Sequence, residues 1–157
     1  MNYFQKNRYV VIKNAISKEL AEFCCDYFSL KRDVHLTMLE KRYISPYVEY
    51  FGRYDDPQVP GTYSHYSDIV METLLSKLLP VMEKNTGIKL YPNYSYARIY
   101  KKGDILKRHK DRISCEISTT LNLGGSPWPI YLEPKKNIGN PKDEKPGITW
   151  ASNNKGK

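Results

Sequence analysis

The stretch from Tyr96 to Leu132 constrains the fold more than any other part of the chain. It reads YARIYKKGDILKRHKDRISCEISTTLNLGGSPWPIYL, so that β-rich runs alternate with turns that contain glycine. Residues 94–100, 117–123 and 128–132 are predicted strands, and turns are predicted at 102–104 and 124–127. Short connections of this kind are typical of antiparallel sheets.

The first half of the chain predicts two helices. Ser17 is a suitable N-cap, and a helical apolar stripe follows it at Leu20, Phe23, Cys24 and Tyr27. A second helix begins at Ser67, meets Pro80, where it must kink or split, and stops at Gly87. Its apolar face consists of Ile69, Val70, Leu74, Leu75, Leu78 and Leu79. Residues 9–12 and 47–51 are predicted as short strands between loops.

Helices followed by strands predict an α+β domain, with the helices supporting an antiparallel sheet. The length of 157 residues suits one domain. We divide it into a helical and loop support region at 1–90, strands that carry the candidate site at 91–134, and a basic loop or tail at 135–157.

The composition favours a protein of the cytoplasm. No apolar run approaches the ~18 residues of a membrane span, and the N-terminus lacks the pattern of a secretory signal. Three cysteines do not make a disulfide framework, and the adjacent Cys24 and Cys25 bridge poorly with each other. A reducing compartment fits this pattern.

The net charge of +8 is unevenly distributed. Residues 98–112 contain seven Lys and Arg but only two Asp, and residues 135–157 contain six Lys but only two acidic residues. Such a positive region attracts anions, whether a dicarboxylate, an acidic protein or a nucleic acid. A solvated, charged tail is the simpler explanation for residues 135–157.

His109 and Asp111 are the candidate metal ligands. They are two residues apart, and residues i and i+2 of an extended chain point to the same side. An imidazole and a carboxylate so placed can occupy neighbouring positions on one metal ion. A second histidine would complete the two-histidine, one-carboxylate site of non-haem Fe(II) oxygenases.

The surrounding motif resembles the catalytic domain of Fe(II)- and 2-oxoglutarate-dependent oxygenases, in particular the prolyl 4-hydroxylase-like group. The matching pattern is Arg98-Ile-Tyr100-Lys-Lys-Gly103, then His109-Lys-Asp111, then the Thr-rich run 118–121. The opening YVVIKN and the following ISKEL also resemble the first strand and helix of that group. The resemblance extends over nearly the whole chain, although the specific motifs lie between residues 94 and 132.

This resemblance implies a double-stranded β-helix, a cupin-like jelly roll, which binds Fe(II), 2-oxoglutarate and O₂, with ascorbate as a candidate reductant. His109 and Asp111 would bind the metal, and Tyr100 would donate to a carboxylate of 2-oxoglutarate. Arg98 is a candidate anion-binding residue, or alternatively the structural partner of an acidic neighbour. The implied reaction oxidises a C–H bond of an unknown primary substrate and converts 2-oxoglutarate to succinate.

The resemblance also implies two groups that the sequence does not supply. No histidine follows Asp111, and neither His35 nor His65 matches the second ligand of the family. Lys155 and Lys157 lie in a Gly/Asn-rich segment and are not assigned as the basic residue that clasps 2-oxoglutarate. We therefore expect the chain to be a C-terminally truncated fragment that lacks the last strands and is inactive, or nearly so, by itself.

Two other functions stay open. The charge and the fourteen tyrosines allow a basic nucleic-acid-binding module, although most tyrosines lie outside the basic clusters. The missing histidine would also suit a metal-free descendant of the oxygenase fold that acts as a binding domain. Of the three functions, we favour the oxygenase.

Overall fold

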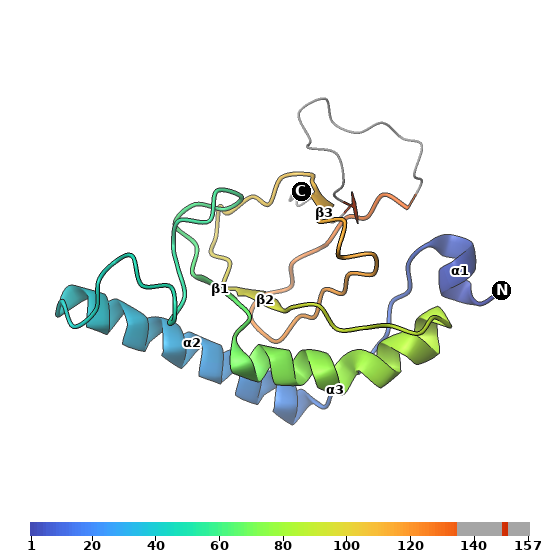
Figure 1. Cartoon of the computed structure of the whole chain (residues 1–157), viewed down its shortest axis with the longest axis horizontal. Coiled ribbons are helices and arrows are strands. Elements are labelled where there is room, and N and C mark those ends of the chain that lie inside the picture. Colours follow the sequence, from blue (N-terminus) through green and yellow to red (C-terminus); the bar gives the residue numbers. More distant parts are fainter. Residues whose placement is uncertain (135–148, 151–157) are drawn as a thin grey trace.

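The computed structural model describes residues 1–134 and 149–150 (Figure 1). Two long helices, α2 and α3, cross at one side of the molecule, and long loops with short strands lie on the other side. In chain order the elements are α1 Tyr3–Asn7, α2 Lys18–Glu40, β1 Ser64–Tyr66, α3 Ile69–Thr86, β2 Tyr96–Arg98, β3 Lys110–Asp111 and β4 Thr149–Trp150.

The first long helix, α2, begins as predicted. The Ser17 side chain accepts a hydrogen bond from the backbone N–H of Leu20 at 3.2 Å, and Glu19 lies in the first turn. The predicted stripe is only partly correct, because Cys24 is buried whereas Phe23 is 63% exposed. The buried side follows Cys24, Phe28 and His35, about one helical step away from Phe23. The helix also continues to Glu40, well past Tyr27, the last residue of the predicted stripe.

The second long helix, α3, begins at Ile69, two residues after the predicted start at Ser67. Asp68 is its N-cap, and the Asp68 side chain accepts from the backbone N–H groups of Val70 and Met71. Gly87 ends the helix in the left-handed conformation, with φ of 69°, as predicted. Pro80 does not split the helix, which is continuous from Ile69 to Thr86, and its axis changes direction along its length in Figure 1. Ile69, predicted on the apolar face, is 81% exposed.

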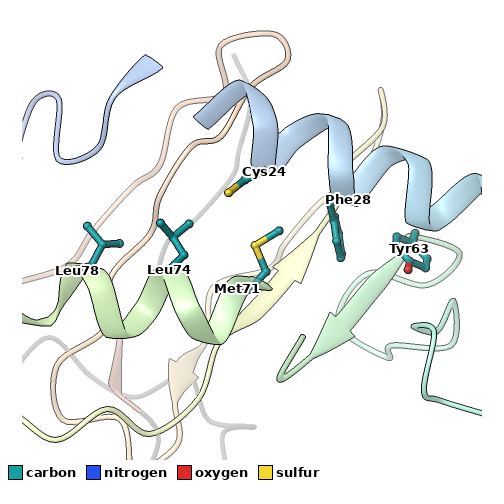
Figure 2. Packing of buried hydrophobic residues seen from close by; sticks show 6 residues of the cluster. All are labelled: Cys24, Phe28, Tyr63, Met71, Leu74 and Leu78. Atoms are coloured by element: carbon teal, nitrogen blue, oxygen red, sulfur yellow. The ribbon is translucent and has the colours of Figure 1, made fainter. Parts of the chain in front are cut away.

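The core lies between the two long helices. In Figure 2 the side chains of Cys24 and Phe28 on α2 point toward Met71, Leu74 and Leu78 on α3. Tyr63, just before β1, closes the same cluster, and its ring lies 5.0 Å from that of Phe28. The helices therefore meet through apolar side chains, whose burial is the main stabilising term of such a fold.

A small antiparallel sheet covers one end of this core. Strand β1 pairs with β2, and the register places Ser64 opposite Arg98 and Tyr66 opposite Tyr96. The predicted strand over 94–100 is thus confirmed at its centre. Strand β3 pairs with β4, with Lys110 opposite Trp150 and Asp111 opposite Thr149.

Four predicted strands are not found. Residues 9–12, 47–51, 117–123 and 128–132 form no hydrogen-bonded strand within the described part of the chain. The alternation in 117–123 still places Leu121 and Leu123 against the core. A strand also needs a partner strand, however, and these residues pair with none of the described ones. The jelly roll and the three-part division of the chain therefore stay predictions, and the predicted tail falls largely outside the described residues.

Across residues 1–134 and 149–150, no helix is both long enough and apolar enough to cross a membrane.

Candidate metal site

His109 and Asp111 lie together at strand β3. The predicted turn before them is present, with Gly103 at φ of 93° and the N–H of Asp104 bonded to the carbonyl of Lys101 at 3.0 Å. The imidazole Nε2 of His109 lies 3.7 Å from Oδ1 of Asp111, and the two side chains are 19% and 25% exposed. The predicted convergence of these two side chains is therefore present.

The other polar atoms of this pair are already occupied. The Nδ1 atom of His109 lies 2.8 Å from the carbonyl oxygen of Lys107. Because a carbonyl only accepts, Nδ1 carries the hydrogen, and a neutral imidazole then has a lone pair on Nε2. The hydroxyl of Ser118 donates to Oδ2 of Asp111. What remains is one lone-pair nitrogen and one carboxylate oxygen that face each other.

A positive charge between or near these two atoms would stabilise this arrangement. A proton on Nε2 would make an imidazolium–carboxylate ion pair, and a divalent metal ion would accept both atoms as ligands. Nitrogen and carboxylate ligands bind such ions at roughly 2.0–2.2 Å, so a separation of 3.7 Å lets both reach one ion. The contact to the Lys107 carbonyl matches the usual second partner of a metal-bound histidine.

The described residues supply no third ligand beside His109 and Asp111. No group of three or more His, Cys, Asp and Glu side chains that could hold a metal ion occurs there. His35 is buried against Tyr54, with ring centroids 5.7 Å apart, and His65 belongs to a separate polar cluster on β1 and α3. The unassigned Lys155 and Lys157 lie outside the described residues.

Arg98 forms an ion pair in the interior. Its guanidinium contacts the carboxylate of Asp56, and the two side chains are only 6% and 9% exposed. Burial by itself would raise the pKa of Asp56, but hydrogen bonds from Tyr96 and the Gln58 backbone, together with the Arg98 charge, hold it below its usual range. Of the two predicted roles for Arg98, the structure shows the one with an acidic neighbour.

Tyr100 is held beside this ion pair. Arg98 Nη1 donates to the Tyr100 hydroxyl at 3.0 Å, and the guanidinium lies 5.4 Å from the tyrosine ring. Because arginine only donates, the hydroxyl hydrogen of Tyr100 is free to bond to another acceptor. The Trp128 ring packs edge-on against Tyr100 at 4.1 Å. Among the described residues, no hydrogen bond joins Arg98 or Tyr100 to the His109–Asp111 pair.

Sequence reasoning missed the partners that orient these groups. No sequence pattern singles out Asp56, and Ser118 stands out only as part of the Thr-rich run 118–121. Neither residue stands at a spacing that local periodicity could connect to its partner. Arg112, one of the flanking cations, lies 5.6 Å from the ring of Tyr94.

Comparison with protein-family models, with curated proteins and with solved structures finds no match to this chain.

Proposed function

We propose that the intact protein is an Fe(II)- and 2-oxoglutarate-dependent dioxygenase in which His109 and Asp111 are two of the metal ligands. One observation carries the proposal: Nε2 of His109 and Oδ1 of Asp111 face each other at 3.7 Å, while the second polar atom of each side chain is held by Lys107 and Ser118. The motif resemblance around residues 98–121 supplies the choice of iron and 2-oxoglutarate.

Each residue has a definite task in this proposal. The Lys107 carbonyl fixes the tautomer and the orientation of the imidazole, and the Ser118 hydroxyl fixes the carboxylate. The free hydroxyl hydrogen of Tyr100 would donate to a carboxylate of 2-oxoglutarate. Arg98 positions this hydroxyl rather than binding the anion, since its charge is paired with Asp56.

The bound iron would supply the redox chemistry, which couples oxidation of a substrate C–H bond by O₂ to conversion of 2-oxoglutarate to succinate and CO₂. A second histidine and a basic residue for 2-oxoglutarate are still required, and residues 112–157 contain no histidine. We therefore expect turnover from a protein that includes them and none from the 157-residue chain alone. The three free cysteines agree with a reducing, cytoplasmic setting.

Binding of Mn(II), a redox-stable stand-in for Fe(II), tests the metal site directly. The affinity of the chain for Mn(II), measured by electron paramagnetic resonance, should fall at least about tenfold in His109→Gln and in Asp111→Asn. The Mn(II) affinity of the Ser118→Ala variant should lie between those of these two variants and that of the wild type. Glu116→Gln removes an exposed carboxylate from the same segment and should change nothing.

The two explanations for the facing atoms give different nitrogen NMR spectra. A neutral His109 ring with its proton on Nδ1, and an Nε2 resonance that Mn(II) broadens, would support the proposal. An imidazolium with protons on both nitrogens at pH 7.5, unaffected by Mn(II), would show an ion pair instead and would overturn it.

A further inference from the structure

A second polar site lies at the junction of α2, β1 and α3. An open pocket of about 430 Å³ is formed there, within the roughly 300–1,000 Å³ of small-molecule sites. Its lining includes Lys31 from α2, Arg53 from the preceding loop, His65 from β1 and Asp68 from the start of α3. Three tyrosines complete the walls, namely Tyr27, Tyr50 and Tyr66.

The carboxylate at the base of this pocket has no free acceptor capacity. The Asp68 side chain is fully shielded from solvent. Its Oδ1 accepts from the N–H groups of Val70 at 2.9 Å and Met71 at 3.2 Å. Its Oδ2 accepts from the Tyr27 hydroxyl at 2.7 Å and from the Lys31 ammonium. A metal ion or an organic cation therefore finds no open ligand in Asp68.

His65, in contrast, offers a donor to the pocket. His65 Nδ1 lies 2.8 Å from the Lys31 Nζ and 3.3 Å from Oδ2 of Asp68. The ammonium is the closer partner and only donates, so Nδ1 accepts from Lys31 rather than donating to Asp68. The neutral ring then carries its hydrogen on Nε2. Among the described residues this N–H has no hydrogen-bond partner. Nε2 is also not one of the buried unpaired polar atoms, so it is accessible from the pocket that His65 lines. The nearby ammonium polarises the ring and strengthens this donor.

Arg53 brings a guanidinium to the mouth of the same pocket; its charge is balanced by Asp55 and Glu49, so it contributes the N–H donors of Nη2 rather than a net positive charge. Its side chain is 34% exposed, and it is held by Asp55 at 2.6 Å and more loosely by Glu49 at 3.4 Å. Glu49 is 67% exposed and points its charge toward this arginine at the rim. Ser67, also in the lining, has an unusual positive φ of 55°, which fixes the turn between His65 and Asp68.

We propose that this pocket binds a small carboxylic acid with a flat, apolar body. The carboxylate would accept from His65 Nε2–H and from the Arg53 guanidinium, which prefers planar carboxylates. The body would lie against the tyrosine rings, of which Tyr50 and Tyr66 are 84% and 45% exposed. The site is separate from the His109–Asp111 pair, and the inference does not depend on the proposed oxygenase function.

Burial and the Lys31 charge lower the pKa of His65, which agrees with a neutral ring at pH 7. Protonation of Nδ1 would displace the Lys31 ammonium from it. Benzoate affinity should therefore follow the neutral form of His65 and should not improve when the pH is lowered from 7.5 to 6.5.

Titration of the chain with benzoate tests the proposal, with nitrogen-detected NMR of the His65 ring as the readout. The expected result is a proton on Nε2 in the free protein and a benzoate-dependent shift of that N–H. Benzamide, which has the same shape but no charge, should bind at least about tenfold more weakly. A proton on Nδ1 of His65, or equal binding of benzamide, would overturn the proposal.

Matched arginine variants test the contribution of the pocket mouth. Arg53→Gln should weaken benzoate binding about tenfold. Arg32→Gln should leave it unchanged, because Arg32 is similarly exposed, at 37%, and also ion-paired, but does not line the pocket. Equal effects of the two variants would overturn the site. Inorganic phosphate is the third ligand to be titrated. If phosphate binds as tightly as benzoate, the assignment of the site to carboxylic acids is overturned.

Discussion

Lys31 and Asp68 join the middle of α2 to the first turn of α3 through an ion pair whose carboxylate is fully shielded from solvent. The same carboxylate is the N-cap of α3 and accepts from the hydroxyl of Tyr27 on α2. A single side chain thus begins one long helix and fastens it to the other. It also holds Lys31, whose ammonium lies 2.8 Å from Nδ1 of His65, and itself lies 3.3 Å from that nitrogen.

We predict that Asp68→Ala is far more destabilising than the loss of an ordinary helix cap. It removes the cap and leaves the Lys31 ammonium, 16% exposed, without its carboxylate. Breaking a buried pair costs about 3–5 kcal/mol, whereas losing a cap costs about 1 kcal/mol. Urea unfolding provides the measurement, and Ser17→Ala, which removes only the cap of α2, is the control. Similar losses in the two variants would contradict the dual role of Asp68.

The acid stability of the fold should depend on the same carboxylate. Burial alone would raise the pKa of Asp68, but hydrogen bonds from Lys31, Tyr27 and the Met71 backbone hold it below its usual range. The unfolded chain then binds a proton near pH 4 that the folded chain does not yet bind. The stabilisation is complete above that pH and is lost as the pH falls through the folded pKa. Carbon NMR titration of the Asp68 carboxylate should give a midpoint below about 3.9, and a higher midpoint would contradict this account.

His35 should make the fold sensitive to mild acid. Its ring is 3% exposed and stacks on Tyr54, and Nδ1 is buried without a hydrogen-bond partner among the described residues. Burial, with smaller contributions from His65 and Lys31, lowers its pKa. The unfolded chain gains a proton below about pH 6.5 before the folded chain does. Stability should therefore decline as the pH falls from 6.5 toward the folded pKa.

His35→Phe tests this prediction while preserving an aromatic ring at the position. The free energy of unfolding at pH 7.5, measured by thermal unfolding, should fall by less than about 1 kcal/mol or should rise, because a buried unpaired polar atom is removed. The loss of stability between pH 7.5 and 5.5 should become smaller, with the remaining part due to His65. An unchanged pH dependence would exclude His35 as the sensor.

Gly87→Ala should strain the end of α3 and displace the Asn2 and Gln5 side chains, which form the capping box of the N-terminal helix α1. Gly87 has φ of 69°, and an added Cβ would lie 2.9 Å from Nδ2 of Asn2 and 3.2 Å from Nε2 of Gln5. Asn2 caps α1 and also donates to the carbonyl of Asn85 at 3.2 Å. The left-handed conformation alone costs about 1 kcal/mol in alanine.

Gly103→Ala is the matched control for this effect. Gly103 also has a positive φ, of 93°, but an added Cβ meets nothing within 4 Å. Both variants should be less stable, because alanine disfavours a positive φ. Only Gly87→Ala should speed hydrogen exchange at the amide of Gln5 and its neighbours in α1. Equal exchange in the two variants would show that α1 does not depend on this contact.

The features predicted correctly from the sequence are those governed by neighbouring residues. The Ser17 cap, the Gly87 stop and the turn at Gly103 depend on local backbone preferences. The convergence of His109 and Asp111 likewise follows from two residues of spacing in an extended chain. These preferences act regardless of the rest of the fold.

The features that were missed depend on residues far apart in the chain. Asp56 and Arg98 are 42 positions apart, and Lys31 and Asp68 are 37 apart, so no local pattern connects them. The alternating run 117–123 was predicted as a strand, yet alternation describes which side chains face the core and not whether a partner strand is present. The exposure of Phe23 has a similar cause, since the packing of α3 selects which side of α2 is buried.

Because Cys25 lies close to the backbone at Gly124, the reactivity of its thiol can report movement of the segment around Gly124. A Cβ at Gly124 would lie 2.7 Å from Cys25 Sγ, so the thiol touches the main chain there, while Leu121 and Leu123 anchor the same segment to the core. Cys25 is only partly exposed, so an alkylating reagent should reach it more slowly while this segment lies on α2. A faster reaction of this sulfur would therefore report movement of residues 121–124 away from α2.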